Sequence, residues 1–586
     1  MAYRANILIN SDAPGAEAVY GAFLDELQEL ALRDEVQVLM TSGLGVGGRG
    51  VEAIVYPDSV RYVNLTPDDV ARIAEEHLLK GRPVLALTQA APKVTPLPPP
   101  APKEVRVVLR NVGKINPFDI EDYIAEDGYA ALAKVLTTMT PEQVLDVLKA
   151  SGLRGRGGAG FPTYLKWTFA RNSPNKPKYL ICNGDEGDPG AFMNRSVLEG
   201  DPHSVIEGMA IAAYVIGAER GYFYVRAEYP IAIRTLRVAL EQAREYGFIG
   251  KDIFGTGFNF DLEIRMGAGA FVCGEETALM RSIEGQRGMP STRPPFPAVS
   301  GLWKQPTNIN NVETYANVPQ ILLKGGEWFA SMGTEKSKGT KTFAIAGKVK
   351  HTGLIEVPLG VTIREIVYDI GGGILNDKKF KAVQTGGPMG GCIPEQYLDL
   401  PVDYESLASV GSIMGSGGFV VMDEDTCMVD IARFFMDFVQ DESCGKCVPC
   451  RVGTRRMLEI LNDICEGRGQ PGDIELLEEM GKSIMRGSLC GLGAGAPNPV
   501  MSTIKYFRHE YEAHIYEKKC PAKVCRALIE YKVDPDLCIG CTRCARNCPV
   551  NAIAGKPKEK HVIDPTICIR CGICKQVCPV AAIDVY

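Results

Sequence analysis

Cysteine is missing from the first part of this 586-residue chain, since none of its 19 cysteines precedes Cys182. Long apolar runs are missing too, and none reaches the roughly 18 residues that a membrane-spanning helix needs. The segment Met1–Asn6 lacks the charge, apolar core and cleavage site of a signal peptide. The net charge is only −7, which gives no argument for nucleic acid or an anionic membrane as a partner. We therefore expect a cytoplasmic protein, and cysteines in metal-ligand spacing agree with a reducing compartment.

The C-terminal region contains the pattern C-x2-C-x2-C-x3-C-P twice. This is the run of bacterial ferredoxins with two [4Fe–4S] clusters, in which the fourth cysteine of each run binds the other cluster. The predicted ligands are Cys538, Cys541, Cys544 and Cys578 for one cluster, and Cys568, Cys571, Cys574 and Cys548 for the other. Zinc also binds C-x2-C pairs, but eight thiolates in two matching runs favour iron–sulfur. The pattern indicates that this chain transfers electrons.

The length requires several hydrophobic cores, about three to five, and the patterns predict a multidomain α/β and α+β fold. Residues 1–94 form a small α/β unit with predicted strands at Asn6–Asn10, Val36–Met40 and Glu52–Tyr56 and helices at Gly15–Leu32 and Pro67–Leu79. Residues 95–104 are rich in proline, which fixes φ, and are predicted to be an extended spacer. The further predicted domains are 105–332 with glycine turns, 333–425 rich in strands, 426–518 helical, and 519–586 with the ferredoxin runs.

A glycine-rich loop at 155–160 contains a literal G-x-G-x-x-G. The preceding segment Pro141–Ser151 is predicted to be a helix, so the dinucleotide-binding fingerprint lacks its usual strand. Taken alone, the loop is equally well explained as an ordinary glycine-rich turn. Four polar or glycine-rich stretches follow it, at Cys182–Gly190, Gly267–Leu279, Arg293–Ala298 and Asn308–Thr314.

Together with the loop, these stretches closely resemble the NADH-binding flavoprotein subunit of respiratory complex I. They also resemble the matching subunits of soluble NAD-linked hydrogenases and formate dehydrogenases. The resemblance covers about 105–516 and implies a Rossmann-like FMN/NADH domain, a β-grasp domain and a helical-bundle cluster domain. The implied FMN- and NAD(H)-binding residues are Gly155, Arg156, Gly157, Gly158, Gly160, Phe161, Lys166, Phe169, Asn183, Asp185, Glu186, Asp188, Phe271, Gly274, Glu275, Glu276, Arg293, Phe296, Asn310 and Asn311.

These matches have a physical sense. Bare backbone N–H groups and Lys166 suit the FMN phosphate and ring. Carboxylates near the ribose, matched by Glu275 and Glu276, favour NAD over NADP. Phe161, Phe169 and Phe296 match rings that stack on the nucleotide, with ordinary core packing as the alternative. Phe271 and Arg293 replace the tyrosine and lysine of many relatives. No catalytic acid or base is expected, because hydride transfer needs stacking and orientation.

A third cysteine group follows in the helical region. Cys444, Cys447 and Cys450 repeat C-x2-C-x2-C, and the resemblance adds Cys490 to make the [4Fe–4S] centre that receives electrons from FMN. Cys465, His514, Cys520 and Cys525 form a three-cysteine, one-histidine set of the structural-zinc type, with free thiols as the alternative. The cysteines that lack partners at ligand spacing, and are predicted to be buried thiols, are Cys182, Cys273, Cys392 and Cys427.

The first ninety residues resemble the thioredoxin-like [2Fe–2S] module often fused ahead of this flavoprotein. Where that module has its ligands, this chain has Asn10, Gly15, Gly43 and Gly47, which cannot hold the cluster. We therefore expect a structural remnant that packs against a partner.

The function implied is electron transfer between NAD(H), FMN and [4Fe–4S] clusters. The implied partners are a small [2Fe–2S] thioredoxin-like subunit, ferredoxin, and a hydrogenase, formate dehydrogenase or NADP-linked flavoprotein subunit. Some relatives bifurcate electrons, and the sequence leaves this open. The alternatives are a stand-alone NADH dehydrogenase and an iron–sulfur scaffold without flavin. The basic excess in 518–575 suits an acidic ferredoxin or simply offsets the charge of the clusters.

Overall fold

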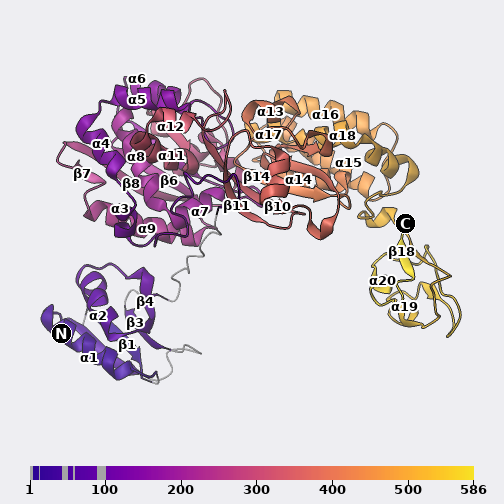
Figure 1. Ribbon diagram of the computed structural model, residues 1–586, viewed down its shortest axis with the longest axis horizontal. Helices are drawn as coiled ribbons and strands as arrows, with labels where there is room; N and C mark the ends of the chain where they lie inside the picture. The colour runs from indigo at the N-terminus through magenta and orange to yellow at the C-terminus, as the bar shows by residue number, and fades with distance from the viewer. Residues whose placement is uncertain (1–3, 12, 42–49, 57–59, 89–99) are drawn as a thin grey trace. The chain divides into compact units, whose positions relative to one another are not determined.

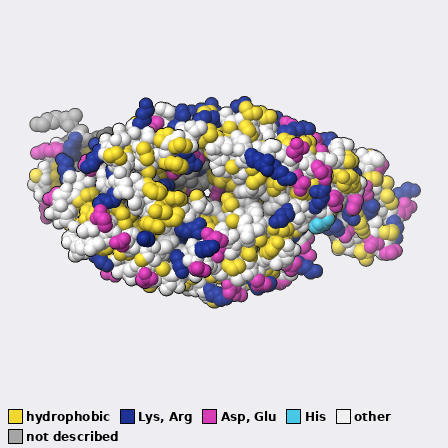
Figure 2. Space-filling view, turned by 90° about the horizontal axis from the view of Figure 1, so that it is seen from above, with side chains coloured by type: hydrophobic (Ala, Val, Ile, Leu, Met, Phe, Trp, Pro, Cys, Tyr) yellow, Lys and Arg dark blue, Asp and Glu magenta, His cyan; other side chains and the backbone are white. Residues whose placement is uncertain are grey.

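The computed structural model describes residues 4–11, 13–41, 50–56, 60–88 and 100–586. The chain divides into two compact units, Met1–Pro96 and Leu97–Tyr586, and each is described by itself (Figure 1). Across the described residues, no helix combines the length and apolar character that crossing a bilayer requires. Charged side chains of both signs are interspersed over the face seen in Figure 2.

The first unit is a four-stranded sheet with two helices. Its strand order is β2-β1-β3-β4, with β1 parallel to β2 and the other pairs antiparallel. The strands are β1 (Ala5–Asn10), β2 (Val36–Thr41), β3 (Val51–Tyr56) and β4 (Val60–Leu65). Helix α1 (Ala16–Glu29) buries Phe23 and Leu27 in the core, and α2 (Pro67–Ile73) continues into a π-helical turn, η1 (Ala74–Leu79).

The sequence predicted these elements to within a few residues, except β4, which it missed. Of the four positions where cluster ligands would stand, Asn10 ends β1 and Gly15 precedes α1 in the left-handed conformation. Gly43 and Gly47 lie outside the described residues. The proline-rich spacer predicted at 95–104 is described only from residue 100 onward.

A five-stranded sheet forms the first layer of the second unit, in the order β7-β8-β6-β5-β9. The four strands from β8 to β9 are parallel, and β7 is antiparallel at one edge. The strands are β5 (Tyr179–Gly184), β6 (Arg220–Arg226), β7 (Gly250–Ile253), β8 (Phe258–Gly267) and β9 (Thr307–Asn311). Helices α8 (Pro202–Ile216), α9 (Pro230–Glu245) and α11 (Val312–Lys324) pack on it, as a mainly parallel sheet requires.

A mixed sheet follows, in the order β11-β10-β14-β12-β13 with β10 and β14 parallel. Its strands are β10 (Thr340–Gly347), β11 (Gly353–Pro358), β12 (Phe380–Thr385), β13 (Gly391–Pro394) and β14 (Gly418–Asp423). Phe343 and Phe419 pack edge to face in its core. The sheet is joined to the first layer by Lys341 of β10, which forms a fully buried ion pair with Glu313 of α11.

The helical region contains α14 (Met428–Asp441), α15 (Arg455–Cys465), α16 (Asp473–Gly487), α17 (Gly491–Gly495) and α18 (Asn498–Glu512), then a π-helical turn, η10 (Ala513–Glu517). The C-terminal module is built twice over from a short strand pair and a one-turn helix. It contains β15 (Tyr531–Val533) paired with β18 (Ile583–Val585), β16 (Ile553–Ala554) paired with β17 (Val562–Ile563), α19 (Arg543–Arg546) and α20 (Ile573–Gln576).

Candidate functional site

The glycine-rich loop connects two helices, α5 (Pro141–Ser151) and α6 (Thr163–Asn172). The N–H of Gly155 donates to the Phe161 carbonyl at 2.8 Å and closes the loop. Gly158 has φ +118°, and a Cβ there would lie 3.0 Å from the backbone of Gly415. The loop must therefore stay bare, and its backbone can approach an anionic group closely.

The side chain of Arg156, which was predicted to belong to the cofactor-binding loop, makes structural hydrogen bonds within the protein. Its guanidinium is fully buried and donates to the carbonyl oxygens of Thr340 (2.9 Å), Lys338 (2.6 Å) and Arg154 (3.0 Å). Its side chain therefore anchors the loop to the start of β10 and to the residues just before it. Sequence alone could not separate these roles, because an arginine in a glycine loop suits a phosphate as well as a set of carbonyls.

The adjacent parallel strands β5 and β9 place asparagines at their carboxyl ends, where open α/β sheets bind ligands. Asn183 stands directly beside Asn311 in the ladder. The Asn183 amide donates to the Gly274 carbonyl at 2.9 Å, which joins β5 to the Gly267–Leu279 stretch. Asn310 is buried and accepts from the Trp167 indole at 2.9 Å, and Asn311 caps α11. Three of the predicted stretches therefore meet at this edge of the sheet.

Three carboxyl groups follow β5 and are buried. Burial raises the pKa of Asp185 to about 7, although Arg226 opposes the shift. Burial likewise raises the pKa of Glu186 to about 7, against the N–H groups of Arg195 and Asn194 at the start of α7 (Met193–Gly200). The Asp188 pKa rises to about 6 for the same reason, although Ser416 donates to it at 2.7 Å. Both Asp185 oxygens lack a hydrogen-bond partner among the described residues, which fits a group waiting for a polar ligand.

Asp185 predicts a pH-dependent stability. Its folded-state pKa of about 7 exceeds the ordinary 3.8. The buried carboxylate therefore does not lower the unfolding free energy below about pH 4, and it lowers that free energy increasingly between about pH 4 and pH 7. We expect Asp185→Asn to raise the unfolding free energy above pH 7 by at most roughly 4 kcal/mol and to leave it unchanged at about pH 4. Thermal unfolding of both proteins across this range measures the difference. A matched change at the exposed Glu263, Glu263→Gln, should give a flat difference, and an equally flat result for Asp185→Asn would contradict the prediction.

A network of charges lies beside the loop. Glu276 contacts Lys166 at 3.1 Å and Arg293 at 2.6 Å. Burial raises the Glu276 pKa, but the two cations outweigh it and the net shift is downward. Glu275 instead caps α10 (Glu276–Ile283), accepting from the N–H groups of Thr277 and Ala278 at 2.9 Å. Of the two carboxylates predicted near the ribose, Glu275 is thus engaged by its own helix.

The predicted stacking rings are exposed. Phe161, Phe169 and Phe296 are 46%, 52% and 57% accessible, and the first two lie 6.4 Å apart between ring centroids. They are therefore not core aromatics, which was the alternative, and they offer apolar faces to a planar ligand. Phe271 packs edge to face with Phe438 at 5.4 Å, and its N–H donates to Glu442 at 2.9 Å.

The Phe271 contacts join the flavin region to the third cysteine group. Glu442 lies two residues before Cys444. Burial raises the pKa of the Cys450 thiol to about 11, and the nearby Cys447, Cys490 and Cys444 thiols add to this rise. Ser443 lies 3.2 Å from the Cys450 sulfur. The structure thus brings these four predicted ligands together next to the predicted flavin residues.

The ferredoxin module contains two cavities, each lined by four cysteines. One is lined by Cys538, Cys541, Cys544 and Cys578. The other is lined by Cys548, Cys568, Cys571 and Cys574. Each cavity combines three cysteines of one run with the last cysteine of the other, as the ferredoxin pattern implies. The donor sets fit two four-iron clusters.

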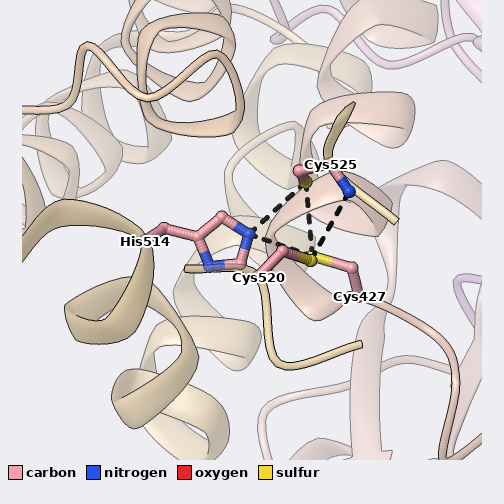
Figure 3. Close-up of side chains that lie close together, drawn as sticks. All are labelled: Cys427, His514, Cys520 and Cys525. Atoms are coloured by element: carbon pink, nitrogen blue, oxygen red, sulfur yellow. Dashed lines mark hydrogen bonds between the residues drawn. The ribbon is translucent and has the colours of Figure 1, made fainter. Parts of the chain in front are cut away.

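A separate group of metal-ligating side chains contains Cys427, His514, Cys520 and Cys525, all buried and converging in Figure 3. The Cys427 and Cys525 sulfurs lie 3.8 Å apart, and each lies 3.4 Å from His514 Nε2. Tetrahedral zinc with the usual bond lengths would place sulfurs about 3.8 Å apart and sulfur from nitrogen about 3.5 Å. His514 Nδ1 lies 2.7 Å from the Glu510 carbonyl, which orients Nε2 toward the sulfurs.

This set corrects one predicted ligand. Cys465 was expected to be the fourth ligand and Cys427 a thiol without partners. In the structure Cys427, which precedes α14, completes the group, while Cys465 ends α15 beside Cys525 and is outside it. Spacing along the chain favoured Cys465, because Cys427 lies 98 residues before Cys525 and only the packing of α14 on α18 brings it close.

Four family models match successive parts of the chain. They are the Nuo51 FMN-binding domain over residues 148–320, an SLBB domain over 342–393, the NADH-ubiquinone oxidoreductase-F iron-sulfur binding region over 430–514, and a 4Fe-4S dicluster domain over 531–585.

The chain is also similar to whole proteins. It is 58% identical to the NADP-reducing hydrogenase subunit HndC of Solidesulfovibrio fructosivorans, over 78% of this chain and 93% of that one. It is 48% identical to an NADH-quinone oxidoreductase subunit of Rhizobium meliloti, over 71% of this chain and 99% of that one. A crystal structure of an NAD+-reducing [NiFe]-hydrogenase in the H2-reduced state superposes with a TM-score of 0.64 at 30% identity, covering 88% of this chain and 85% of that one.

Fold and site together define an oxidoreductase subunit that carries a flavin and [4Fe–4S] clusters and transfers electrons. The chain belongs to the family of NADH-binding flavoprotein subunits that complex I shares with NAD(P)-linked hydrogenases.

Proposed function

We propose that this chain exchanges hydride with NAD(H) at an FMN site and passes single electrons through three [4Fe–4S] clusters to partner proteins. The observation that carries the proposal is the junction at Phe271. This residue of the predicted flavin region donates a hydrogen bond to Glu442 and packs on Phe438, both of which shortly precede Cys444. A cofactor beside Asn183 and Asp185 would lie next to the cluster that accepts its electrons.

Bound FMN would supply the conversion between two-electron hydride chemistry and one-electron transfer. The bare glycine loop and Lys166 would hold its phosphate, and Asn183, Asp185, Asn310 and Asn311 would fix its ring. Phe161, Phe169 and Phe296 would stack on the nucleotide, while Glu276 between Lys166 and Arg293 would contact its ribose. These residues position and bind, so no acid or base is assigned.

The partners proposed are a small [2Fe–2S] subunit, ferredoxin, and a subunit that carries hydrogenase, formate dehydrogenase or NADP chemistry. The relatives support this, because HndC is a subunit of an NADP-reducing hydrogenase. We propose further that the first unit is a thioredoxin-like domain without a cluster and that the sheet from β10 to β14 is a β-grasp domain. The strand orders support both names.

The functional test is the composition and reactivity of the chain isolated without oxygen from its own cells, with whatever co-purifies. We expect one FMN and about 12 iron per chain, and reduction of flavin and clusters by NADH. Protein that contains iron but no FMN would instead support the alternative of an iron–sulfur scaffold without flavin. A chain that oxidises NADH rapidly with no partner present would instead be a stand-alone dehydrogenase.

We also propose that Cys427, His514, Cys520 and Cys525 bind a structural zinc ion that ties α14 to the segment before the ferredoxin module. The expected content is one zinc per chain. Cys427→Ser is expected to lose the zinc. It should also lower the thermal unfolding temperature of the helical region and the ferredoxin module that the site connects, because a closed tetrahedral site contributes directly to folding. Metal analysis and calorimetry measure both.

The matched control for the zinc site is Cys465→Ser, which changes the neighbouring thiol that sequence spacing favoured. It should retain full zinc. Loss of zinc from Cys465→Ser together with retention in Cys427→Ser would reverse the assignment.

A further inference from the structure

The two halves of the ferredoxin module place different side chains at equivalent positions. Tyr531 and His561 each stand seven residues before the first cysteine of a run, Cys538 and Cys568, at the start of Tyr-Lys-Val-Asp-Pro and His-Val-Ile-Asp-Pro. Each is followed by the same Asp-Pro turn, and Asp534 and Asp564 accept from the N–H groups of Asp536 and Thr566 at 2.8 Å in both halves.

His561 faces the first cysteine cavity. Its side chain is buried and lines the cavity formed by Cys538, Cys541, Cys544 and Cys578. The ring packs closely against the backbone of Gly555, where a Cβ would lie only 2.7 Å from it. Nδ1 lies 3.1 Å from the Glu559 carbonyl, and Nε2 is buried with no hydrogen-bond partner among the residues that the structure describes.

Tyr531 lies near the second cavity, beside Gly572 of its lining. Cys574, Cys571 and Cys568 add to the burial that raises the Tyr531 pKa, so the phenol lies near these thiols. A Cβ on Gly572, next to Cys571, would lie 2.9 Å from its hydroxyl oxygen. The first cavity therefore has an imidazole from the opposite half in its lining, whereas the phenol of Tyr531 lies beside the second cavity without lining it.

An unpartnered buried nitrogen is costly unless a ligand completes it. Four thiolates around a four-iron cluster carry net negative charge, and their sulfurs accept hydrogen bonds. Nε2 is the ring nitrogen without a partner among the described residues, and an N–H group there would find its acceptor in one of these sulfurs.

We propose that His561 donates a hydrogen bond from Nε2 to a sulfur of the cluster held by Cys538, Cys541, Cys544 and Cys578, and so sets its reduction potential above that of the second cluster. The inference rests on the proposed cluster assignment. A reduced cluster carries one more negative charge than an oxidised one, so a hydrogen bond donated to its sulfur stabilises the reduced form more. The first cluster is therefore the one that holds the electron longer within the module.

The test uses the full chain with its clusters, isolated without oxygen, and redox titration followed by electron paramagnetic resonance. In His561→Phe we expect about a tenfold lower ratio of reduced to oxidised first cluster at a fixed potential, equivalent to about 59 mV for one electron. His561→Gln, a neutral donor, should recover part of this shift. Tyr531→Phe is the matched control and should leave the first cluster unchanged.

A second measurement needs no variant. In wild-type protein with isotopically labelled histidine, one reduced cluster of the module should show hyperfine coupling to a histidine nitrogen and to a proton that exchanges in deuterium oxide. Absence of both couplings overturns the proposal, even if His561→Phe fails to retain its cluster. Unchanged potential in an iron-replete His561→Phe also overturns it. Wild-type protein without the module's iron would instead refute the cluster assignment itself.

Discussion

Replacing Cys490 with alanine is expected to remove about four iron atoms per chain and to stop electrons from NADH at the flavin. Cys490 precedes α17 and faces Cys444 and Cys450 across the third cysteine group, next to the Phe271 junction. Three thiolates cannot complete a four-cysteine site, and no described residue beside it is assigned as a substitute ligand. Iron analysis, spectra of the remaining clusters and NADH-dependent reduction of the ferredoxin module measure the outcome.

Flavin content and NADH-dependent reduction of a small dye that takes electrons from FMN should persist in Cys490→Ala, because the flavin residues are untouched. The matched control is Cys392→Ala, which removes a buried thiol on β13 that lies in no cysteine group. This control should retain all iron. Full reduction of the module by NADH in Cys490→Ala would exclude the third cluster from the electron path.

Lys341→Met is expected to destabilise the second unit by roughly 3–5 kcal/mol, because it leaves the Glu313 carboxylate buried without its cation. Both side chains are almost inaccessible, at 0% and 1%. Burial lowers the Lys341 pKa, and Glu313 opposes that shift. The lysine also donates to the Ser416 carbonyl at 2.6 Å, and the Ser416 hydroxyl donates to Asp188. Thermal unfolding at a fixed scan rate, followed together with flavin release, measures the effect.

The double variant Lys341→Met with Glu313→Gln should recover a large part of that loss, since no unpaired charge remains. The matched control is Lys350→Met in the same domain, where the pair with Asp377 is 40% and 85% accessible and contributes less than about 1 kcal/mol. Equal losses from Lys341→Met and Lys350→Met would show that the buried pair has no special role.

Sequence reasoning predicted best where chemistry and short spacing coincide. The two ferredoxin runs specified both four-cysteine cavities, including the exchange of Cys548 and Cys578, because the turn after each proline constrains the chain locally. The helix before the glycine loop and three of the four strands of the first unit were also predicted, since apolar periodicity reports local burial.

Sequence reasoning failed where the answer depends on distant packing. Cys427 joins His514, Cys520 and Cys525 only through the contact between α14 and α18, and nothing in its neighbourhood in the sequence indicates this. The Arg156 side chain points inward because Thr340 at the start of β10 and Lys338 just before it present carbonyl oxygens to it. Strand β4 has a burial pattern too irregular for a clear period, which is why it was missed.

The position of Cys427 has a topological consequence. A metal ion that joins Cys427 to Cys525 closes a loop of 98 residues, and that loop contains all four thiols of the third cysteine group. Such a cross-link removes conformational freedom from the unfolded chain equivalent to roughly 5 kcal/mol for a loop of about 100 residues. The order of maturation then matters. If zinc binds first, the segment between Cys427 and Cys525 has fewer conformations available, so Cys444 and Cys490 come together more readily. The cluster would then be inserted into a segment whose two ends are already cross-linked.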